Sequence, residues 1–265
     1  MSWEGWAPTT GLPDSRWRRE LPSHPAMARP VAQLELEVLP QPDNSTCGPT
    51  CLHAVYRYWG DSIPLEQVIS EVTPLDEGGT LGVWLACHAL RRGYNAEIYS
   101  YNLSLFDPTW FTKAADLSER LRAQKAFKPH RKLSLEADAF LELLELGGTV
   151  QMKELTDDLV ADLLERRIPV LTGLSATYLY GCPREFEQEP DDLRGLPTGH
   201  FVVLCGYDEA RREVMVADPL QDNPGFSSQY YRVGMDRLIA SILLGIVTYD
   251  ANLVIITPRD KKGIV

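Results

Sequence analysis

The sequence predicts an α+β fold, in which a helical half precedes an antiparallel sheet half. Between residues 47 and 167 apolar side chains recur every three to four positions, which is typical of helices that bury one face. From residue 168 onward the period changes to two, which is typical of strands joined by turns. Separate runs of helices and strands, with no internal repeat, favour α+β over a regularly alternating α/β architecture.

Each predicted element follows from a local signal. Residues 32–41 alternate as a strand and lead into a helix over 47–59. Thr46 is a potential N-cap of that helix, and Pro49 suits its first turn. Further helices are predicted at 64–72, 79–93, 112–127, 133–147 and 156–167, and strands at 95–102, 168–180, 199–209, 212–219 and 252–258. The longest apolar run, 238–249, is shorter than the roughly 20 residues of a membrane span, so it predicts a core helix leading into the last strand.

Composition and charge limit the classes of partner. The chain has 265 residues, 44% of them hydrophobic, so it can build an ordinary core without disulfides or metals. Its net charge of −11 argues against nucleic acid and against an anionic membrane surface as partners. Its five cysteines form an odd, irregularly spaced set, which indicates reduced thiols in a cytoplasmic protein rather than a secreted disulfide framework.

The first 28 residues are predicted to form a poorly ordered N-terminal arm. Proline, tryptophan and charged residues are scattered through them, and they lack the apolar core of a secretory signal. Met27 is a possible true start, because the ordered pattern begins just after it. Residues 29–265 are then expected to form one domain.

One group of residues has the pattern of nucleophilic catalysis. Cys47 stands at the predicted start of a helix, and a helix N-terminus stabilises the reactive thiolate form of a cysteine. His200 opens one strand and Asp218 ends the next, so antiparallel pairing should bring them into hydrogen-bonding range, with Asp218 fixing the imidazole tautomer. Gln41, in the loop before the helix, is expected to aim its amide at the same point as the backbone N–H of Cys47. Those two donors would form an oxyanion hole.

This arrangement resembles the papain-like cysteine peptidases, and among them the double-glycine leader peptidases and their stand-alone relatives. The sharpest motifs are "QPDNSTCGPTCL" and "GHFVVL…VADP", and the resemblance runs in order from residue 34 to 257. It implies a papain-like fold with Cys47 as nucleophile, His200 as base, Asp218 as orienting acid and Gln41 as oxyanion donor. It implies no cofactor and no metal.

The chain departs from that family in two respects. The helical block over residues 107–148 is larger than a minimal member needs, so it is predicted to be an insertion. No fused transporter is present in the sequence, so the exporter context of the leader peptidases is not expected to apply.

Other candidate groups have weaker patterns. A zinc site built from Cys47, Cys51 and His53 is disfavoured, because position 53 lies off the shared helix face and no second ligand pair follows. Cys51 is expected to be a small buried side chain one turn below Cys47. Asp208 is the rival orienting acid, but the turn-like sequence after it favours a hairpin residue.

Residues 181–199 are predicted to form an acidic loop that returns directly into His200. Gly199 should leave room for a substrate backbone, and a redox role or substrate contact stays open for Cys182. We consider two interpretations: a solvated loop that keeps the surface soluble, and a lid whose negative field draws a cationic group to the cleft. Under the second, five acids contribute to substrate binding: Glu185, Glu187, Glu189, Asp191 and Asp192.

These features predict an enzyme, namely a cysteine peptidase or amide hydrolase that forms an acyl-thioester on Cys47. The expected substrate is a peptide or small amide, and the lid interpretation of the acidic loop favours a cationic one. An acyl or peptidyl transferase with an amine acceptor is the alternative within chemistry, because the same site serves both reactions. A catalytically silent peptide-binding module is the alternative outside it. The oligomeric state stays open.

Overall fold

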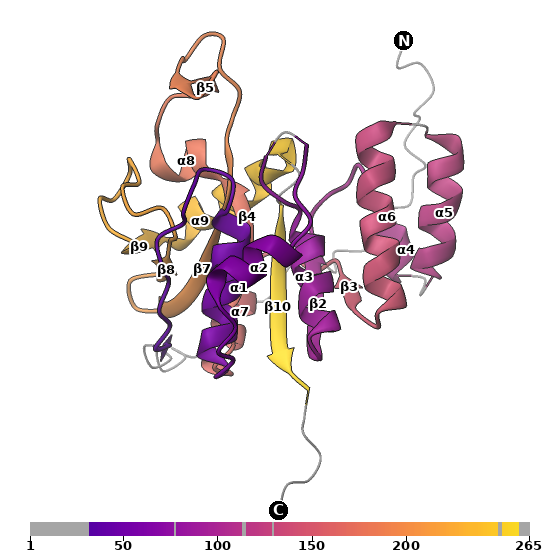
Figure 1. Ribbon diagram of the computed structural model, residues 1–265, viewed down its shortest axis with the longest axis horizontal. Coiled ribbons are helices and arrows are strands. Elements are labelled where there is room, and N and C mark those ends of the chain that lie inside the picture. The colour runs from indigo at the N-terminus through magenta and orange to yellow at the C-terminus, as the bar shows by residue number, and fades with distance from the viewer. Residues whose placement is uncertain (1–31, 77, 113–114, 129, 249–250, 260–265) are drawn as a thin grey trace, which may run out of the picture.

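One large sheet with helices packed against it forms the frame of the molecule (Figure 1). The computed structural model describes residues 32–76, 78–112, 115–128, 130–248 and 251–259. The arm predicted over residues 1–28, with Met27, lies outside these residues. None of the helices in the described segments combines the length and hydropathy needed to cross a bilayer.

The elements follow one another in the order expected from the sequence, with some additions. The helices are α1 (Cys47–Tyr58), α2 (Leu65–Glu71), α3 (Gly82–Arg91), α4 (Pro108–Thr112), α5 (Leu117–Phe127), α6 (Arg131–Glu145), α7 (Asp157–Glu165), α8 (Ala176–Tyr180), α9 (Met235–Leu244) and the 3₁₀ turn η1 (Gly245–Thr248). The strands are β1 (Ala32–Gln33), β2 (Tyr94–Ser100), β3 (Thr149–Gln151), β4 (Val170–Ser175), β5 (Glu185–Phe186), β6 (Glu189–Pro190), β7 (Gly199–Asp208), β8 (Glu213–Ala217), β9 (Tyr230–Gly234) and β10 (Asn252–Pro258).

The main sheet draws strands from both halves of the chain. Its order is β3-β2-β10-β4-β7-β8-β9, and β1 pairs with β7. The β2–β3 pair is parallel, and the other pairs are antiparallel. Leu174 of β4 lies opposite His200 of β7, and Val203 of β7 lies opposite Ala217 of β8. This register brings the start of β7 beside the end of β8.

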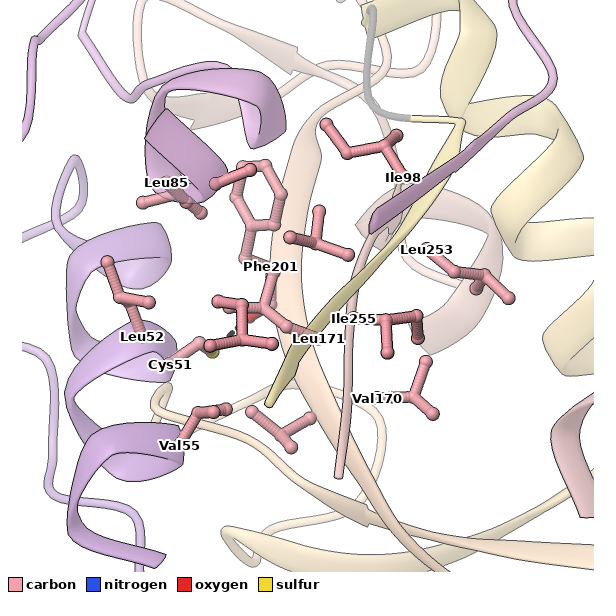
Figure 2. Close-up of a cluster of buried hydrophobic side chains, with 14 of the residues drawn as sticks. Cys51, Leu52, Val55, Leu85, Ile98, Val170, Leu171, Phe201, Leu253 and Ile255 are labelled. Atoms are coloured by element: carbon pink, nitrogen blue, oxygen red, sulfur yellow. Dashed lines mark hydrogen bonds between the residues drawn. The ribbon is translucent and has the colours of Figure 1, made fainter. Parts of the chain in front are cut away.

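The core lies between the sheet and the helices on its two faces. Strands β4 and β10 are buried at successive positions, which requires cover on both sides. Figure 1 shows α1 and α3 in front of the sheet, with α9 behind it. In Figure 2, Cys51 of α1 points toward the strand that carries Phe201, whose carbonyl accepts a hydrogen bond from its thiol. Helix α1 is therefore anchored on the strand that begins with Gly199 and His200.

The predicted α+β class is confirmed: the helix that begins at Cys47 packs on a mostly antiparallel sheet. The strand predicted over 32–41 is wrong beyond Gln33, although its alternation persists as buried Leu34, Leu36 and Val38. The single strand predicted over 168–180 is also wrong. It ends at Ser175, whose side chain accepts a hydrogen bond from the backbone N–H of Tyr178 and so starts α8.

The block over residues 107–148 is helical, as predicted, and it lies at one side of the molecule (Figure 1). Helix α5 packs on α6, and α6 packs on α3. Asp116 caps α5 by accepting from the backbone N–H of Glu119 at 3.1 Å. That the block is an insertion stays a prediction.

Candidate active site

Cys47 is the first residue of α1 and is 8% exposed. Thr46 occupies the N-cap position, but its side chain makes no capping hydrogen bond and contacts Asp43 instead. The first N–H groups of α1 are therefore not taken by a capping side chain, so the positive end of the helix lies at Cys47 without a cap. Cys51, one turn on, is fully buried, and its Sγ donates to the Phe201 carbonyl at 3.2 Å.

His200 and Asp218 form a buried pair across β7 and the end of β8. The Nε2 atom of His200 lies 2.8 Å from Oδ1 of Asp218. The side chain of Cys47 lies close enough to His200 to help raise the pKa of its imidazole. Because Asp218 occupies Nε2, the other ring nitrogen, Nδ1, is left for Cys47. The structure thus brings together three residues that lie up to 171 positions apart in the chain.

Asp218 is fully buried and is held by four donors. Besides His200, the backbone N–H of Leu220 donates to Oδ1 at 2.9 Å. The hydroxyls of Tyr180 and Tyr231 each donate to Oδ2 at 2.7 Å. A buried carboxylate with this set of donors is stable as an anion.

The electrostatics of the pair favour an imidazolium beside a carboxylate. Burial by itself lowers the pKa of His200, but the hydrogen bond and charge of Asp218, with the contact to Cys47, outweigh it and raise the pKa to about 10. Burial likewise works against ionised Asp218, yet the charge of His200 and the hydrogen bonds from His200, Tyr231 and Tyr180 lower its pKa below the usual value. His200 therefore carries its proton through the neutral range while Asp218 stays ionised.

Gln41 lies beside this group, because its backbone N–H donates to the carbonyl of Pro219 at 2.9 Å. Its side-chain Nε2 donates to the carbonyl of Asp43 at 2.8 Å, and its Oε1 is buried without a hydrogen-bond partner. The amide nitrogen carries two hydrogens, so the bond to Asp43 uses one and leaves the second. The structure thus places Gln41 near the predicted site with its amide held by its own loop.

The segment predicted as an acidic loop contains a two-stranded hairpin, β5–β6, with a two-residue turn at Glu187 and Gln188. Both turn residues have positive φ, as the tight hairpin turns of twisted strands require. Figure 1 shows the hairpin projecting from the end of the sheet at which α8 lies. Gly199, where the segment returns, pairs with Ser175.

The five acids of this hairpin differ in their contacts. Asp191 accepts from the backbone N–H groups of Leu193 and Arg194 and from the Arg194 side chain, and these bonds, those from Arg194 first, lower its pKa. It therefore stabilises the turn. The other four have exposed or half-exposed side chains: Glu185, Glu187, Glu189 and Asp192.

Asp208, the rival acid, lies at the opposite end of β7 from His200 and pairs with Arg211 at 2.9 Å. Cys182 is partly exposed just after α8, and Cys205 is buried in β7. Among the described residues, Cys205 donates its thiol to the Met215 carbonyl and the backbone N–H of Cys182 donates to the Thr177 carbonyl, so these bonds do not reach Cys47.

Tyr180 and Tyr231 are the site residues that the sequence analysis missed. Tyr180 was assigned to a strand, and β9, which carries Tyr231, was not predicted. One signal was present: two tyrosines, both within 40 positions of Asp218, lie in short segments next to turn-rich sequence. A buried carboxylate needs donors beyond one histidine, so nearby tyrosines were candidates.

Residues 145–237 match a family model described as "Peptidase_C39 like family". The match confirms the predicted resemblance to papain-like cysteine peptidases over about a third of the chain. That segment holds His200, Asp218, Tyr180 and Tyr231, whereas Gln41 and Cys47 lie before it. No curated protein matches the chain in sequence.

Solved structures with a similar course of the chain include three proteases or peptidases. A putative C39-like peptidase from Bacillus anthracis has 14% identity and a TM-score of 0.49, covering 87% of this chain and 99% of that one. A double glycine motif protease from an AMS/PCAT transporter, in complex with its leader peptide, has 16% identity, a TM-score of 0.44 and coverage of 86% and 95%. The peptidase domain of Streptococcus ComA has 12% identity, a TM-score of 0.41 and coverage of 84% and 99%. These values leave the chemistry of the site to be argued from its own residues.

Proposed function

We propose that the chain is a cysteine peptidase or amide hydrolase that acts through an acyl-thioester on Cys47. The observation that carries the proposal is the joint contact of His200 with Cys47 and Asp218. Nε2 of His200 lies 2.8 Å from Oδ1 of Asp218, and Cys47 lies close enough to the imidazole to help raise its pKa. A nucleophile, a base and an orienting acid in this order are the parts that nucleophilic catalysis needs.

Acylation uses each of these groups once. His200 holds the proton as an imidazolium, and the Cys47 thiolate beside it attacks the carbonyl carbon of the scissile bond. The developing oxyanion accepts hydrogen bonds from the backbone N–H of Cys47 and from the second amide hydrogen of Gln41. These two donors are the proposed oxyanion hole. The tetrahedral intermediate then collapses as the imidazolium of His200 protonates the leaving amine, and the acyl group stays on sulfur.

Deacylation returns the enzyme to its starting state. His200 removes a proton from a water molecule, whose oxygen attacks the thioester carbon. The C–S bond then breaks, the carboxylic acid leaves, and Cys47 is left as a thiolate beside protonated His200. Asp218 stays an anion throughout and keeps Nε2 of His200 as the donor to it.

The acidic hairpin supports a cationic substrate, such as a peptide amino terminus or a basic side chain. Glu185, Glu187 and Glu189 are exposed on the hairpin, and the segment that contains it ends at Gly199, next to His200. The chain as a whole carries a net charge of −11, so the field around this hairpin is not offset elsewhere by an excess of cations.

The test is turnover of a library of internally quenched peptides by the parent protein and by Cys47→Ala and His200→Ala. Both variants are expected to lose on the order of 10³-fold or more in rate while staying folded by circular dichroism, because residues of such a group act as a unit. Cys182→Ala is the matched control and should keep the parent rate. Rates within tenfold of the parent for folded Cys47→Ala would sink the proposal. Cleavage in H₂¹⁸O separates hydrolysis, which labels the new carboxylate, from transfer to an amine, which does not.

A further inference from the structure

Two tyrosines bind the buried carboxylate of Asp218, and a phenylalanine packs against both of their rings. Tyr180 ends α8, Tyr231 lies in β9, and Phe226 comes from the loop between β8 and β9. Phe226 stacks on Tyr231 with ring centres 3.8 Å apart and planes 4° from parallel, and it meets the ring of Tyr180 edge-on at 6.4 Å. The two tyrosine rings therefore share one aromatic neighbour and cannot move independently of it.

The backbone also limits the position of Tyr180. A side chain at Gly225 would put its Cβ 2.9 Å from the Cα of Tyr180, so the loop backbone lies directly against that residue. Burial raises the pKa of both tyrosine hydroxyls, which keeps them protonated and therefore able to donate. Both donate to the same oxygen, Oδ2, at 2.7 Å.

We infer that Tyr180 and Tyr231 are positioning residues that hold the Asp218 carboxylate in the orientation in which Oδ1 faces His200. The inference rests on the proposed function and assigns its orienting acid two further partners. With Oδ2 bound by two hydroxyls, rotation of the carboxylate about its Cβ–Cγ bond would break two short hydrogen bonds in a site closed to solvent. Oδ1 therefore stays with His200 Nε2 and the Leu220 N–H.

The ionisable groups that face Asp218 come from four elements. His200 of β7, Tyr180 of α8 and Tyr231 of β9 contact its carboxylate directly, and Cys51 of α1 lies near enough for the charge of Asp218 to help raise the pKa of its thiol. The groups are His200, Tyr180, Tyr231, Cys47 and Cys51. Only His200 supplies a positive charge among these, so the hydroxyls are the remaining side-chain groups that favour the anion.

A purely structural role of the two tyrosines would need their rings and not their hydroxyls. Tyr180→Phe, Tyr231→Phe and the double variant keep the rings and their contacts with Phe226 and remove only the donors. Tyr58→Phe is the matched control, because it removes a hydroxyl that donates to the Arg167 carbonyl at 2.8 Å, far in the fold from Asp218.

Two measurements test the inference in the full chain. The first is a pH titration of the Asp218 Cγ resonance by ¹³C NMR. That resonance is assigned as the aspartate signal that disappears in Asp218→Asn. The second is the rate of iodoacetamide alkylation at Cys47 between pH 4 and 8, followed by mass spectrometry, with thermal melts beside it. In each Tyr→Phe variant we expect the Asp218 titration and the acid limb of alkylation to move to higher pH. The alkylation rate near that limb should fall about tenfold per hydroxyl, the size of a hydrogen bond to a charged group.

The inference would be overturned if Asp218 titrated in the double variant at the same pH as in the parent and in Tyr58→Phe. This holds even if the melting temperature of the double variant falls. The proposed function fails separately. If the parent's Cys47 is alkylated no faster at pH 6 than its Cys182, the nucleophile assignment is wrong, and the Asp218 titration alone still decides the role of the tyrosines.

Discussion

Replacing Gly48 with alanine is expected to destabilise the fold and to displace the nucleophile at the same time. Gly48 follows Cys47 in α1, and an added Cβ would lie 2.7 Å from Cγ2 of Thr80, 3.2 Å from Phe201 and 3.3 Å from Leu85. Thr80 cannot turn away freely, because it is buried and its hydroxyl donates to the Thr73 carbonyl at 2.7 Å.

The size of the effect follows from the closest contact. Moving the new methyl group from 2.7 Å to the ordinary contact distance of 3.4 Å requires a displacement of ~0.7 Å, and the first turn of α1 must supply part of it. Overpacking of this kind costs roughly 1–3 kcal/mol, or about 2–4 °C of melting temperature per kcal/mol in a chain of this size. A shift near 1 Å at a reacting atom can lower the rate on the order of 10²-fold.

The assay compares thermal melts and iodoacetamide alkylation of Cys47 in Gly48→Ala and Gly234→Ala. Gly234 is the control, because a Cβ there meets no atom within 4 Å and its φ is −61°. Its substitution should stay within about 0.5 kcal/mol of the parent. The reasoning would be refuted if Gly48→Ala had the same melting temperature as Gly234→Ala and if Cys47 in Gly48→Ala were alkylated at the parent rate.

Three further predictions concern charge. Burial lowers the pKa of His200, but Asp218 outweighs it and raises this pKa to about 10. In the unfolded chain the pKa is ~6.5. The stabilisation of the fold by protonated His200 is therefore complete below pH ~6.5 and is lost as the pH rises toward 10. Urea melts over this interval should show that loss, and His200→Gln should flatten it. Burial raises the pKa of Glu136 from 4.5 to about 7, so stability should fall as the pH rises through that range, and Glu136→Gln, which keeps an acceptor for Asn102, should abolish the fall. Neutralising the four acids of the segment other than Asp191 should raise KM for a basic peptide and leave kcat unchanged. The dependence of KM on ionic strength should become flatter. Salt curves parallel to those of the parent would leave the acids only a role in solubility.

The pairing of His200 with Asp218 could be predicted from sequence because it depends on strand order alone. Each residue sits at one end of a strand with clear alternation, and antiparallel neighbours bring such ends together. The start of α1 at Cys47 was likewise visible, since Pro49 and the apolar spacing after it define the helix.

Tyr180 and Tyr231 could not be predicted because their positions depend on tertiary contacts. The six residues from Ser175 to Tyr180 alternate as well as a strand does, and only the hydrogen bond from Tyr178 to the Ser175 hydroxyl turns the chain into α8. Strand β9 is five residues long and owes its place to pairing with β8, which no local pattern reveals. The amide of Gln41 is a similar case, since its bond to Asp43 depends on the turn that the loop adopts.

Strand β10 has a consequence for the order in which the molecule is completed on the ribosome. It is made after every residue of the candidate site, yet it lies between β2 and β4 and joins them. Until it emerges, the nascent chain holds two unpaired strand edges that other chains can pair with. The sheet cannot be completed before β10 is synthesised. A chain whose translation stops before residue 252 therefore has the candidate site residues but lacks the strand that joins the two parts of the sheet.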